Sequence, residues 1–325
     1  MWKPLLCTAI IAHASFGVWA ASGKADTYPN KPIRVLDGFA AGGGSDYVAR
    51  VIGPKITESL GQTVIVDNRP GAGANLAAEI TARANPDGYT LMLVAVTALA
   101  TSPNLYPKLG YDLLKDFSYI SLVAEGAFVL VAHPSVPARS LPDLLSAAKA
   151  KPKSISYGSS GVAGGGHLAM ELLQSRAGAE FHHVPYNGAG PAVIALVGGE
   201  VQLVLGTTAS AMQMIKAKRV HALAVTSPKR VEALPDVPTI AESGFPGYAV
   251  TVDYGLVAPT GTPAAVIRML NAEIQRIARM DDIKAKLAVQ GFEPASSTPA
   301  EFRALTKAQV ELWTRVIKNA RITAN

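Results

Sequence analysis

The chain has 325 residues, with 30 Lys and Arg against 24 Asp and Glu, a single Cys and a formal net charge of +6. Its length suggests about two domains of ~150 residues each, and a hydrophobic content of 49% excludes a disordered chain. One Cys excludes a disulfide scaffold and a cysteine-based metal cluster.

Residues 1–25 have the three parts of a secretory signal peptide: a basic Lys3, an apolar stretch and a group of small residues. A membrane anchor is the alternative interpretation, but polar residues interrupt the stretch and it is short for a spanning helix. Cleavage after Ala20 or Ala25 removes Cys7, so we expect an exported mature protein that has no cysteine and needs no redox help to fold in an oxidising compartment.

Strands and helices alternate in the first third of the mature chain. Runs rich in β-branched residues predict the strands, and apolar residues at helical spacing predict the helices. The expected order is strand Pro32–Ala40, helix Asp46–Leu60, strand Thr63–Asn68, helix Asn75–Ala84 and strand Thr90–Val96. Such alternation implies an α/β fold with a parallel, doubly wound sheet.

The alternation begins again after an apolar strand at Phe128–Pro134. The expected elements are helix Leu141–Ala150, strand 155–159, helix His167–Ala177, strand 180–186, helix Pro191–Val197, strand 201–207, helix Ala209–Lys216 and strand 220–226. A strand at Ala249–Pro259 and two amphipathic helices, near 264–279 and 299–318, complete the chain.

Two α/β units with a crossing strand at each junction predict two lobes and a cleft between them. The candidate crossing strands are Phe128–Pro134 and Val250–Ala258. We therefore expect lobe I to comprise residues 26–127 plus 253–325, and lobe II to comprise residues 128–252. The C-terminal helices are expected to pack on lobe I.

Two glycine-rich turns, Gly38–Asp46 and Tyr157–Leu173, each connect a predicted strand to a predicted helix. Glycine lets a ligand approach the backbone, and the first N–H groups of a helix favour an anion. Either turn alone is also typical of an ordinary tight turn. Two such turns, one in each lobe, favour an anion site in the cleft, at the carboxyl ends of the strands.

The residues around both turns favour a carboxylate over a phosphate. No Lys or Arg lies between Val35 and Tyr47 or between Ser154 and Gln174, whereas a tight phosphate site usually recruits one. The P-loop pattern is absent, and the Gly71–Leu76 segment lacks the third glycine of a dinucleotide fingerprint, so we interpret it as a structural turn and expect no cofactor. The basic residues are scattered, which argues against nucleic acid as a partner.

No catalytic or metal-binding pattern stands out. Ser159 and Ser160 do not have the spacing of a nucleophile elbow, because position 162 is Val. His182 and His183 are neighbours on a predicted strand and would point to opposite faces, so we expect no shared metal.

Several polar residues keep two interpretations each. His167, at a helix start, either contacts a ligand or caps its turn. Asp46 either binds a ligand group or caps its own helix. Asp253 and Tyr254 either line the cleft or form a hinge pair, and the turn 186–188 is either a ligand loop or an ordinary reversal.

Over nearly its whole mature length the sequence resembles the Bug receptors, the extracytoplasmic solute-binding proteins of tripartite tricarboxylate transporters. The matching segments, in order, include GGGSDYVAR, VIVDNRPGAGANLAAE, NPDGYTLM, HVPYNGAGPAVIALVGGEVQ, LPDVPTIAESGFPGY and GLVAPTGTP. The resemblance implies a type II periplasmic-binding-protein (Venus-flytrap) fold that closes on a small organic acid and delivers it to a membrane permease. We expect a monomer that is not an enzyme.

The resemblance also implies which residues contact the ligand. These are Phe39, Ala41, Gly42, Gly43, Ser45 and Asp46 in the first loop, Ser159, Ser160, Gly161 and His167 in the second, and Thr97, Ala98, Tyr186 and Asp253 elsewhere. The sequence departs from the family at Ala40 and Ala41, which replace prolines, and at residues 163–165, where a serine is often found. Both departures lie in the predicted ligand loops, so they affect which acid the protein binds and not its fold.

Two other functions use the same features. A sensor subunit would close on a ligand and dock on a membrane kinase instead of a permease, and the sequence does not separate these. A secreted hydrolase would use a serine of the second turn as its nucleophile, and the missing elbow motif argues against it.

Overall fold

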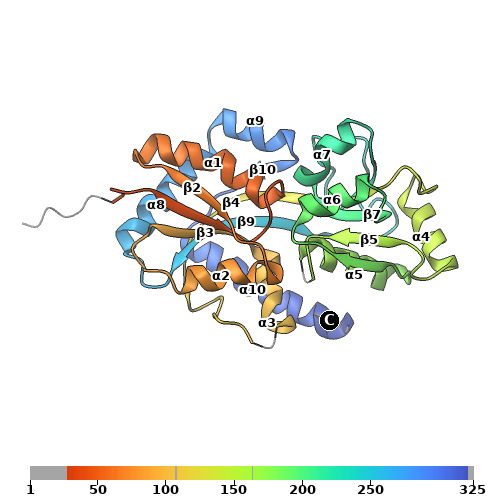
Figure 1. Ribbon diagram of the computed structural model, residues 1–325, viewed down its shortest axis with the longest axis horizontal. Helices are drawn as coiled ribbons and strands as arrows, with labels where there is room; N and C mark the ends of the chain where they lie inside the picture. The colour runs from red at the N-terminus through yellow and green to blue at the C-terminus, as the bar shows by residue number, and fades with distance from the viewer. Residues whose placement is uncertain (1–27, 107, 163, 321–325) are drawn as a thin grey trace, which may run out of the picture.

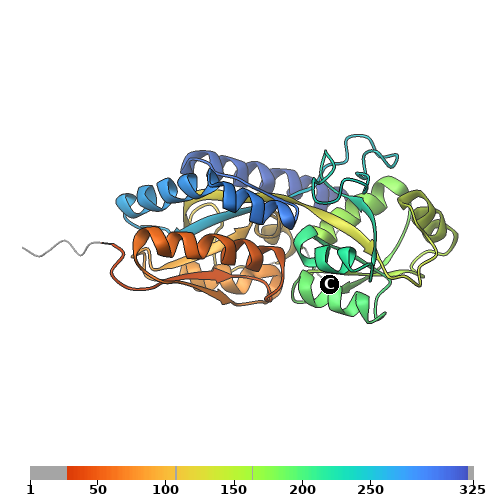
Figure 2. The same ribbon diagram turned by 90° about the horizontal axis from the view of Figure 1, so that it is seen from above.

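The computed structural model describes residues 28–106, 108–162 and 164–320 (Figure 1). The predicted signal peptide lies outside the described residues. Two bodies lie side by side and are joined by long strands, as Figure 2 shows from above. The protein therefore has the expected two-lobed α/β architecture.

Lobe I contains elements from both ends of the chain. They are β1 (Ile33–Asp37), α1 (Gly44–Leu60), β2 (Val64–Asn68), the 3₁₀ turn η1 (Ala72–Ala74), α2 (Asn75–Ala82), β3 (Thr90–Ala95), α3 (Val96–Leu105), the first part of β4 (Phe117–Ala132), β9 (Thr251–Pro259), α8 (Ala264–Ala278), α9 (Asp281–Val289), β10 (Phe292–Pro294) and α10 (Pro299–Ala320).

Lobe II contains the middle of the chain. Its elements are the end of β4, α4 (Leu141–Ala150), β5 (Ser156–Ser159), α5 (Gly165–Ala177), β6 (His182–Pro185), α6 (Ala189–Val197), β7 (Leu203–Thr207), α7 (Thr208–Lys216) and β8 (His221–Val225).

The sheet is mixed rather than wholly parallel, and its strand order is β2-β1-β3-β9-β4-β7-β5-β6. β1 is parallel to β2 and β3, as the alternation predicts. β9 is antiparallel to both β3 and β4. The expectation of a parallel sheet is wrong here, because β4 leaves lobe I and β9 returns to it from lobe II.

The chain crosses between the lobes within β4. Its residues Phe117–Ala127 pair with β9, whereas Phe128–Ala132 pair with β7. On the way back, the Val250 N–H donates to the Thr226 carbonyl in lobe II at 2.9 Å, and Thr251 already pairs with Ala127. Strand pairing thus passes from lobe I to lobe II after residue 127 and back near residue 250; the division at 127/128 and 252/253 stays a prediction.

Four elements were not expected from the sequence: α3, the first part of β4, α9 and β10. α3 begins directly after β3 at Val96, a β-branched residue that extends the strand pattern by one position. The two predicted C-terminal helices are confirmed as α8 and α10, and both pack against β4. No helix within the described ranges is long and apolar enough to cross a bilayer.

The sheet of lobe I is buried on both faces, as the alternating side chains of β3 show. In β3, Leu91 and Leu93 belong to one hydrophobic cluster, and Met92 and Val94 belong to another on the opposite face. Burial of both faces is typical of parallel strands covered by helices. The covering helices fix the sheet in this position, and the carboxyl ends of β1 and β3 lie at the boundary between the lobes.

Candidate functional site

A cavity lies between the lobes, and we call it the central cavity. Its lining comes from both lobes: Phe39, Gly43, Gly44, Ser45, Ala95, Thr97, Ala98, Phe128, Ser160, Gly165, Ala189, Thr207, Val252 and Tyr254. None of these described lining residues is Lys, Arg, His, Asp or Glu. Any charge that a ligand brings must therefore be met by dipoles.

Five helices begin at this cavity. The lining includes a residue at the N-terminus of α1, α3, α5, α6 and α7. The first N–H groups of a helix have no partner inside the helix, and the helix dipole places partial positive charge there. The convergence gives an uncharged cavity the electrostatic preference of an anion site.

Sequence analysis identified two of these helix starts, α1 and α5, from their glycines. The resemblance added α3 through Thr97 and Ala98, which both line the cavity. It missed α6 and α7. Thr207 was the available signal, because a Thr that ends a strand and begins a helix is a preferred N-cap; its Oγ1 accepts from the Ser210 N–H at 3.4 Å.

Gly44, in the first loop, lies close to both β9 and lobe II. A Cβ on Gly44 would lie 2.7 Å from the Tyr254 hydroxyl and 2.9 Å from Thr207 Oγ1. Glycine therefore permits α1 to approach β9 and lobe II at the same point. Gly42 has a φ of 85°, a conformation that also favours glycine.

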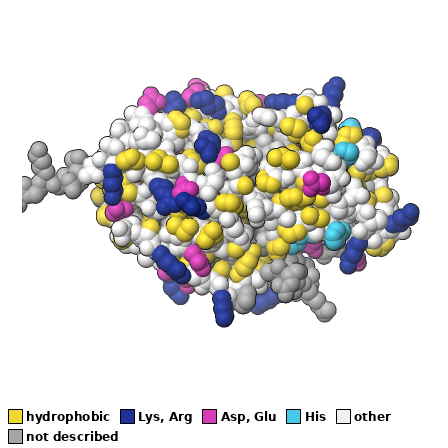
Figure 3. All heavy atoms as spheres, viewed as in Figure 1, with side chains coloured by type: hydrophobic (Ala, Val, Ile, Leu, Met, Phe, Trp, Pro, Cys, Tyr) yellow, Lys and Arg dark blue, Asp and Glu magenta, His cyan; other side chains and the backbone are white. Residues whose placement is uncertain are grey.

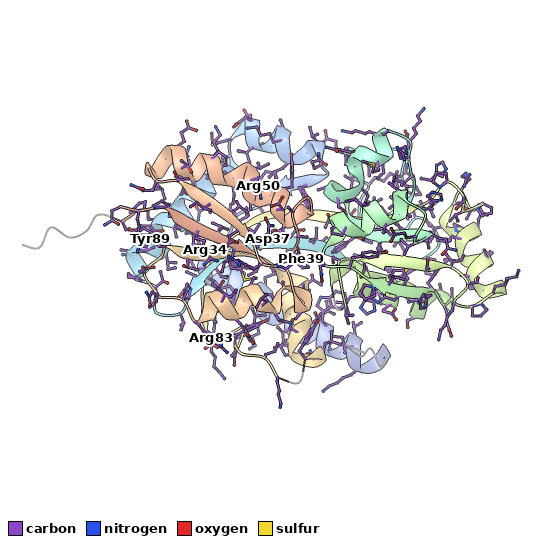
Figure 4. The ribbon with its side chains drawn as sticks, viewed as in Figure 1. Arg34, Asp37, Phe39, Arg50, Arg83 and Tyr89 are labelled. Atoms are coloured by element: carbon purple, nitrogen blue, oxygen red, sulfur yellow. The ribbon has the colours of Figure 1, made fainter. Side chains whose placement is uncertain are left out.

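Asp37, the last residue of β1, lies beneath the first loop and was not identified from the sequence. Its carboxylate accepts hydrogen bonds from Ser45 Oγ at 3.0 Å, Asn68 Nδ2 at 3.1 Å and the Phe39 N–H at 3.2 Å. It is fully buried, and burial raises its pKa to about 7. Figure 4 shows Asp37 and Phe39 at the end of lobe I that faces lobe II. Asp37 positions two residues of the cavity lining.

Asp46 is not part of the cavity lining. Its carboxylate accepts from the Gly42 N–H at 3.1 Å and from Arg50 Nε at 2.9 Å. Burial opposes ionisation of Asp46, but the hydrogen bonds from Arg50 and Gly42 outweigh it and lower its pKa. Of its two interpretations, this geometry favours the helix cap.

In the second loop, Ser160 and Gly165 line the central cavity, whereas Ser159 and His167 lie behind it. The ring of His167 stacks on His183, with centroids 4.0 Å apart and an interplanar angle of 5°. Burial lowers the pKa of His167 to about 4 and, together with the nearby histidines, that of His183 to about 3. Both imidazoles are therefore neutral near pH 7.

Ser159 Oγ lies 2.7 Å from His183 Nε2, a distance that would suit a nucleophile and its base. Ser159 is 0% exposed, however, and it is absent from the cavity lining. His182 is exposed while His183 packs inward, as expected for neighbours on a strand. Among the described residues, no three His, Cys, Asp or Glu side chains are arranged to hold a metal ion.

Asp253 also lies outside the cavity lining. Its neighbours Val252 and Tyr254 line the central cavity, and alternate side chains of a strand point to opposite faces. Asp253 pairs across the strands with Glu125, and burial and this second carboxylate raise its pKa to about 6. The neighbouring Tyr254 occupies the position that the prediction gave to Asp253.

A second cavity shares Phe39 and Ser160 with the central cavity, and we call it the outer cavity. Its other lining residues are Gly38, Gly71, Ala72, Gly73, Ala74, Tyr106, Gly161, Val162, Pro185, Tyr186 and Asn187. The predicted ligand residues Gly161 and Tyr186 are thus in the outer cavity. Ala41 and Gly42 line neither; they pack against Gly190 of α6. Ala163 lies outside the described residues.

Residues 48–322 match the family model described as tripartite tricarboxylate transporter family receptor. Protein BugT of Bordetella pertussis is 35% identical over 315 residues, covering 97% of this chain and 96% of BugT. The structure resembles R. palustris Rpa4515 with adipate, with a TM-score of 0.88 and 33% identity over 91% of this chain and 99% of that one. It also resembles Rhodopseudomonas palustris MatC with bound malate, with a TM-score of 0.84 and 30% identity over 89% and 100%.

Proposed function

We propose, from the premise that this chain belongs to the tripartite tricarboxylate transporter receptor family, that it captures a small organic acid in the central cavity and presents it to a membrane permease. The observation that carries the proposal is the convergence of five helix N-termini on a cavity whose described lining has no charged side chain. Relatives of the same fold have adipate and malate bound.

Backbone N–H groups suit this task because they are fixed in place before the ligand arrives. A carboxylate bound by them forms charge-assisted hydrogen bonds without a cation that must itself be desolvated. Ser160 and Thr207 add hydroxyl groups from lobe II, whereas the Ser45 hydroxyl already donates to Asp37. A ligand held by both lobes stabilises the closed arrangement relative to an open one.

Contacts between the lobes show what such closure would involve. The Ala40 N–H donates to the Asn187 carbonyl at 3.1 Å, and Thr208 Oγ1 donates to the Gly291 carbonyl at 3.3 Å. Each contact joins residues that we assign to different lobes. We infer that the closed surface formed in this way is what a permease recognises; a sensor kinase would recognise the same surface.

The periplasm is the proposed location, which rests on the predicted signal peptide at residues 1–25 and on the family. Binding rather than catalysis is the proposed role, because Ser159 of the described Ser159–His183 pair is buried and absent from the cavity lining. We propose a monomer that acts without a cofactor.

A thermal-shift screen tests this function. The mature protein is heated with acetate, succinate, malate, adipate, citrate and benzoate, and separately with the neutral amide of each acid. At least one acid should raise the melting temperature by mass action while its amide does not. If no acid stabilises the protein, or if amides do so equally, the carboxylate receptor is the wrong conclusion.

A further inference from the structure

The outer cavity adjoins the central cavity, and Phe39 and Ser160 line both. A carboxylate at the helix N-termini would therefore have the rest of its molecule directed past these two residues. The chemistry of the outer cavity then decides which acids fit.

Aromatic rings surround this space. Tyr106 comes from lobe I and Tyr186 from lobe II, and Phe39 lies at the junction of the two cavities. Burial raises the pKa of both phenols, so both stay neutral at physiological pH. Aromatic side chains favour a ring between them, through offset-stacked or edge-to-face contacts.

A second carboxylate finds no partner of opposite charge in the outer cavity. None of its described lining residues is Lys, Arg or His. The start of α2 lies beside it, but the turn η1 uses N–H groups there: Ala74 donates to Gly71 O at 3.0 Å, and Asn75 donates to Ala72 O. The Asn75 side-chain amide also donates to Ala72 O, at 2.6 Å. An anionic group there would meet only the neutral donors of the lining, the hydroxyls of Tyr106, Tyr186 and Ser160 and the Asn187 amide, with no cation to offset its lost hydration.

The lobes meet over this cavity. A Cβ on Gly73 of lobe I would lie 3.2 Å from Tyr106 Oη and 3.2 Å from the Val162 carbonyl of lobe II. Closing of the lobes thus brings Tyr106 and the second loop together around the space. A flat group fits between Tyr106 and the second loop better than a branched, hydrated group does.

We propose that the outer cavity binds an aromatic ring joined to the carboxylate by a short chain, so that the substrates of this receptor are aryl and arylalkyl monocarboxylates. The inference rests on the proposed function, because it takes the carboxylate of the ligand to be held at the five helix N-termini.

Calorimetry with a matched series tests the substrate class. The aryl acids are benzoate, phenylacetate and 3-phenylpropionate; hexanoate is the aliphatic monoacid, and adipate carries a second carboxylate at a similar length. At least one aryl acid should bind ten-fold or more tightly than both hexanoate and adipate. Adipate binding as tightly as every aryl acid would overturn the proposal and leave the carboxylate receptor intact. If no acid in the series or in the thermal screen binds, the proposed function itself is wrong.

Substitutions of the two tyrosines locate the ring. Tyr106→Leu and Tyr186→Leu should each weaken binding of the preferred aryl acid at least five-fold while changing hexanoate affinity less than two-fold. Tyr89→Leu, a lobe I tyrosine outside both cavities, is the control and should change neither. An equal loss for aryl acids and hexanoate would show that the rings only support the fold, and no loss in either variant would show that the ring binds elsewhere.

Discussion

The residues that shape the central cavity are small, because backbone N–H groups rather than side chains face the ligand. Gly43 is the N-cap of α1, and its backbone has ordinary extended angles, with φ −84° and ψ 176°. A Cβ at this position would have Ala40 O as its nearest neighbour, at 3.5 Å, which is an ordinary contact. Glycine at position 43 therefore serves access to the helix start rather than the fold.

Gly43→Val should abolish carboxylate binding, with a loss of at least a hundred-fold in affinity, because the added side chain covers the first N–H groups of α1. The free energy of unfolding should fall by only about 1 kcal/mol, the usual cost of a poor N-cap residue, because a Cβ at this buried position meets only Ala40 O at an ordinary distance. Calorimetry and urea unfolding measure the two quantities. Gly198→Val, at the exposed end of α6, is the control. Normal affinity in Gly43→Val would show that the first turn is not the site.

Asp37 should make the stability of the protein depend on pH. Its pKa is about 7 when folded and 3.8 ordinarily, so the folded state holds a proton that the unfolded chain releases between these values. The contribution of Asp37 to the free energy of unfolding should therefore fall as pH rises from about 4 to about 7, at up to about 1.4 kcal/mol per pH unit, and change no further above that range.

Asp37→Asn removes this contribution. The stability advantage of the wild type over the variant should shrink as pH rises through the same window, while titrations common to both proteins, such as those of His167 and His183, cancel. Urea unfolding of both proteins at pH 4.5, 6, 7 and 8 measures the difference. A difference that does not change with pH would show that Asp37 ionises at its ordinary pKa.

Among the secondary-structure elements, the helices that begin at the central cavity are the ones proposed to bind the ligand. Thr207 caps α7 and lines the central cavity, whereas Ser140 caps α4, which lies at the far end of lobe II (Figure 1). Both side chains accept a hydrogen bond from a backbone N–H three residues later. They are therefore a matched pair for separating capping from ligand binding.

Thr207→Ala and Ser140→Ala should each lower the free energy of unfolding by about 1 kcal/mol, the usual cost of a lost cap. Only Thr207→Ala should also weaken carboxylate binding, by about ten-fold, because a hydroxyl is lost from the cavity. Thermal unfolding and calorimetry provide both values. Equal affinities in the two variants would place α7 outside the site.

At the scale of the whole molecule, small residues lie where the two lobes meet. Gly190, in the first turn of α6, faces the first loop: a Cβ there would lie 3.2 Å from Ala41 O and 3.3 Å from Gly42 C.

Lys and Arg side chains are spread over the face shown in Figure 3, so no dense basic patch marks this side of the molecule.

Gly190→Val should hold the lobes apart. We expect a ligand-saturated radius of gyration larger than that of the wild type, and an affinity weaker by at least ten-fold, because part of the binding free energy would be used to close against the added side chain. Small-angle scattering and calorimetry test this. Gly198→Val, at the other end of the same helix, should behave like the wild type. Tight closure in Gly190→Val would refute the role of this contact.

Local pattern by itself determined the order of most strands and helices, because periodicity records which face of each element is buried. It also determined that α1 and α5 begin at glycine-rich turns without nearby cations. The two crossing strands predicted the two lobes, and the resemblance added the family and its fold, which the comparisons confirm. Neither the local pattern nor the resemblance predicted the mixed sheet or α3. The direction of β9 depends on how the chain returns from lobe II.

Only the tertiary structure decided which polar side chains reach the central cavity. Asp46 and His167 belong to the correct helices, yet Asp46 turns to Gly42 and Arg50, and His167 stacks on His183. Asp253 lies on the correct strand but on the other face from Tyr254. Sequence spacing assigns a residue to an element, but its side-chain direction and the approach of the second lobe depend on contacts far apart in the chain. Those same contacts bring α6 and α7 to the cavity beside α1, α3 and α5.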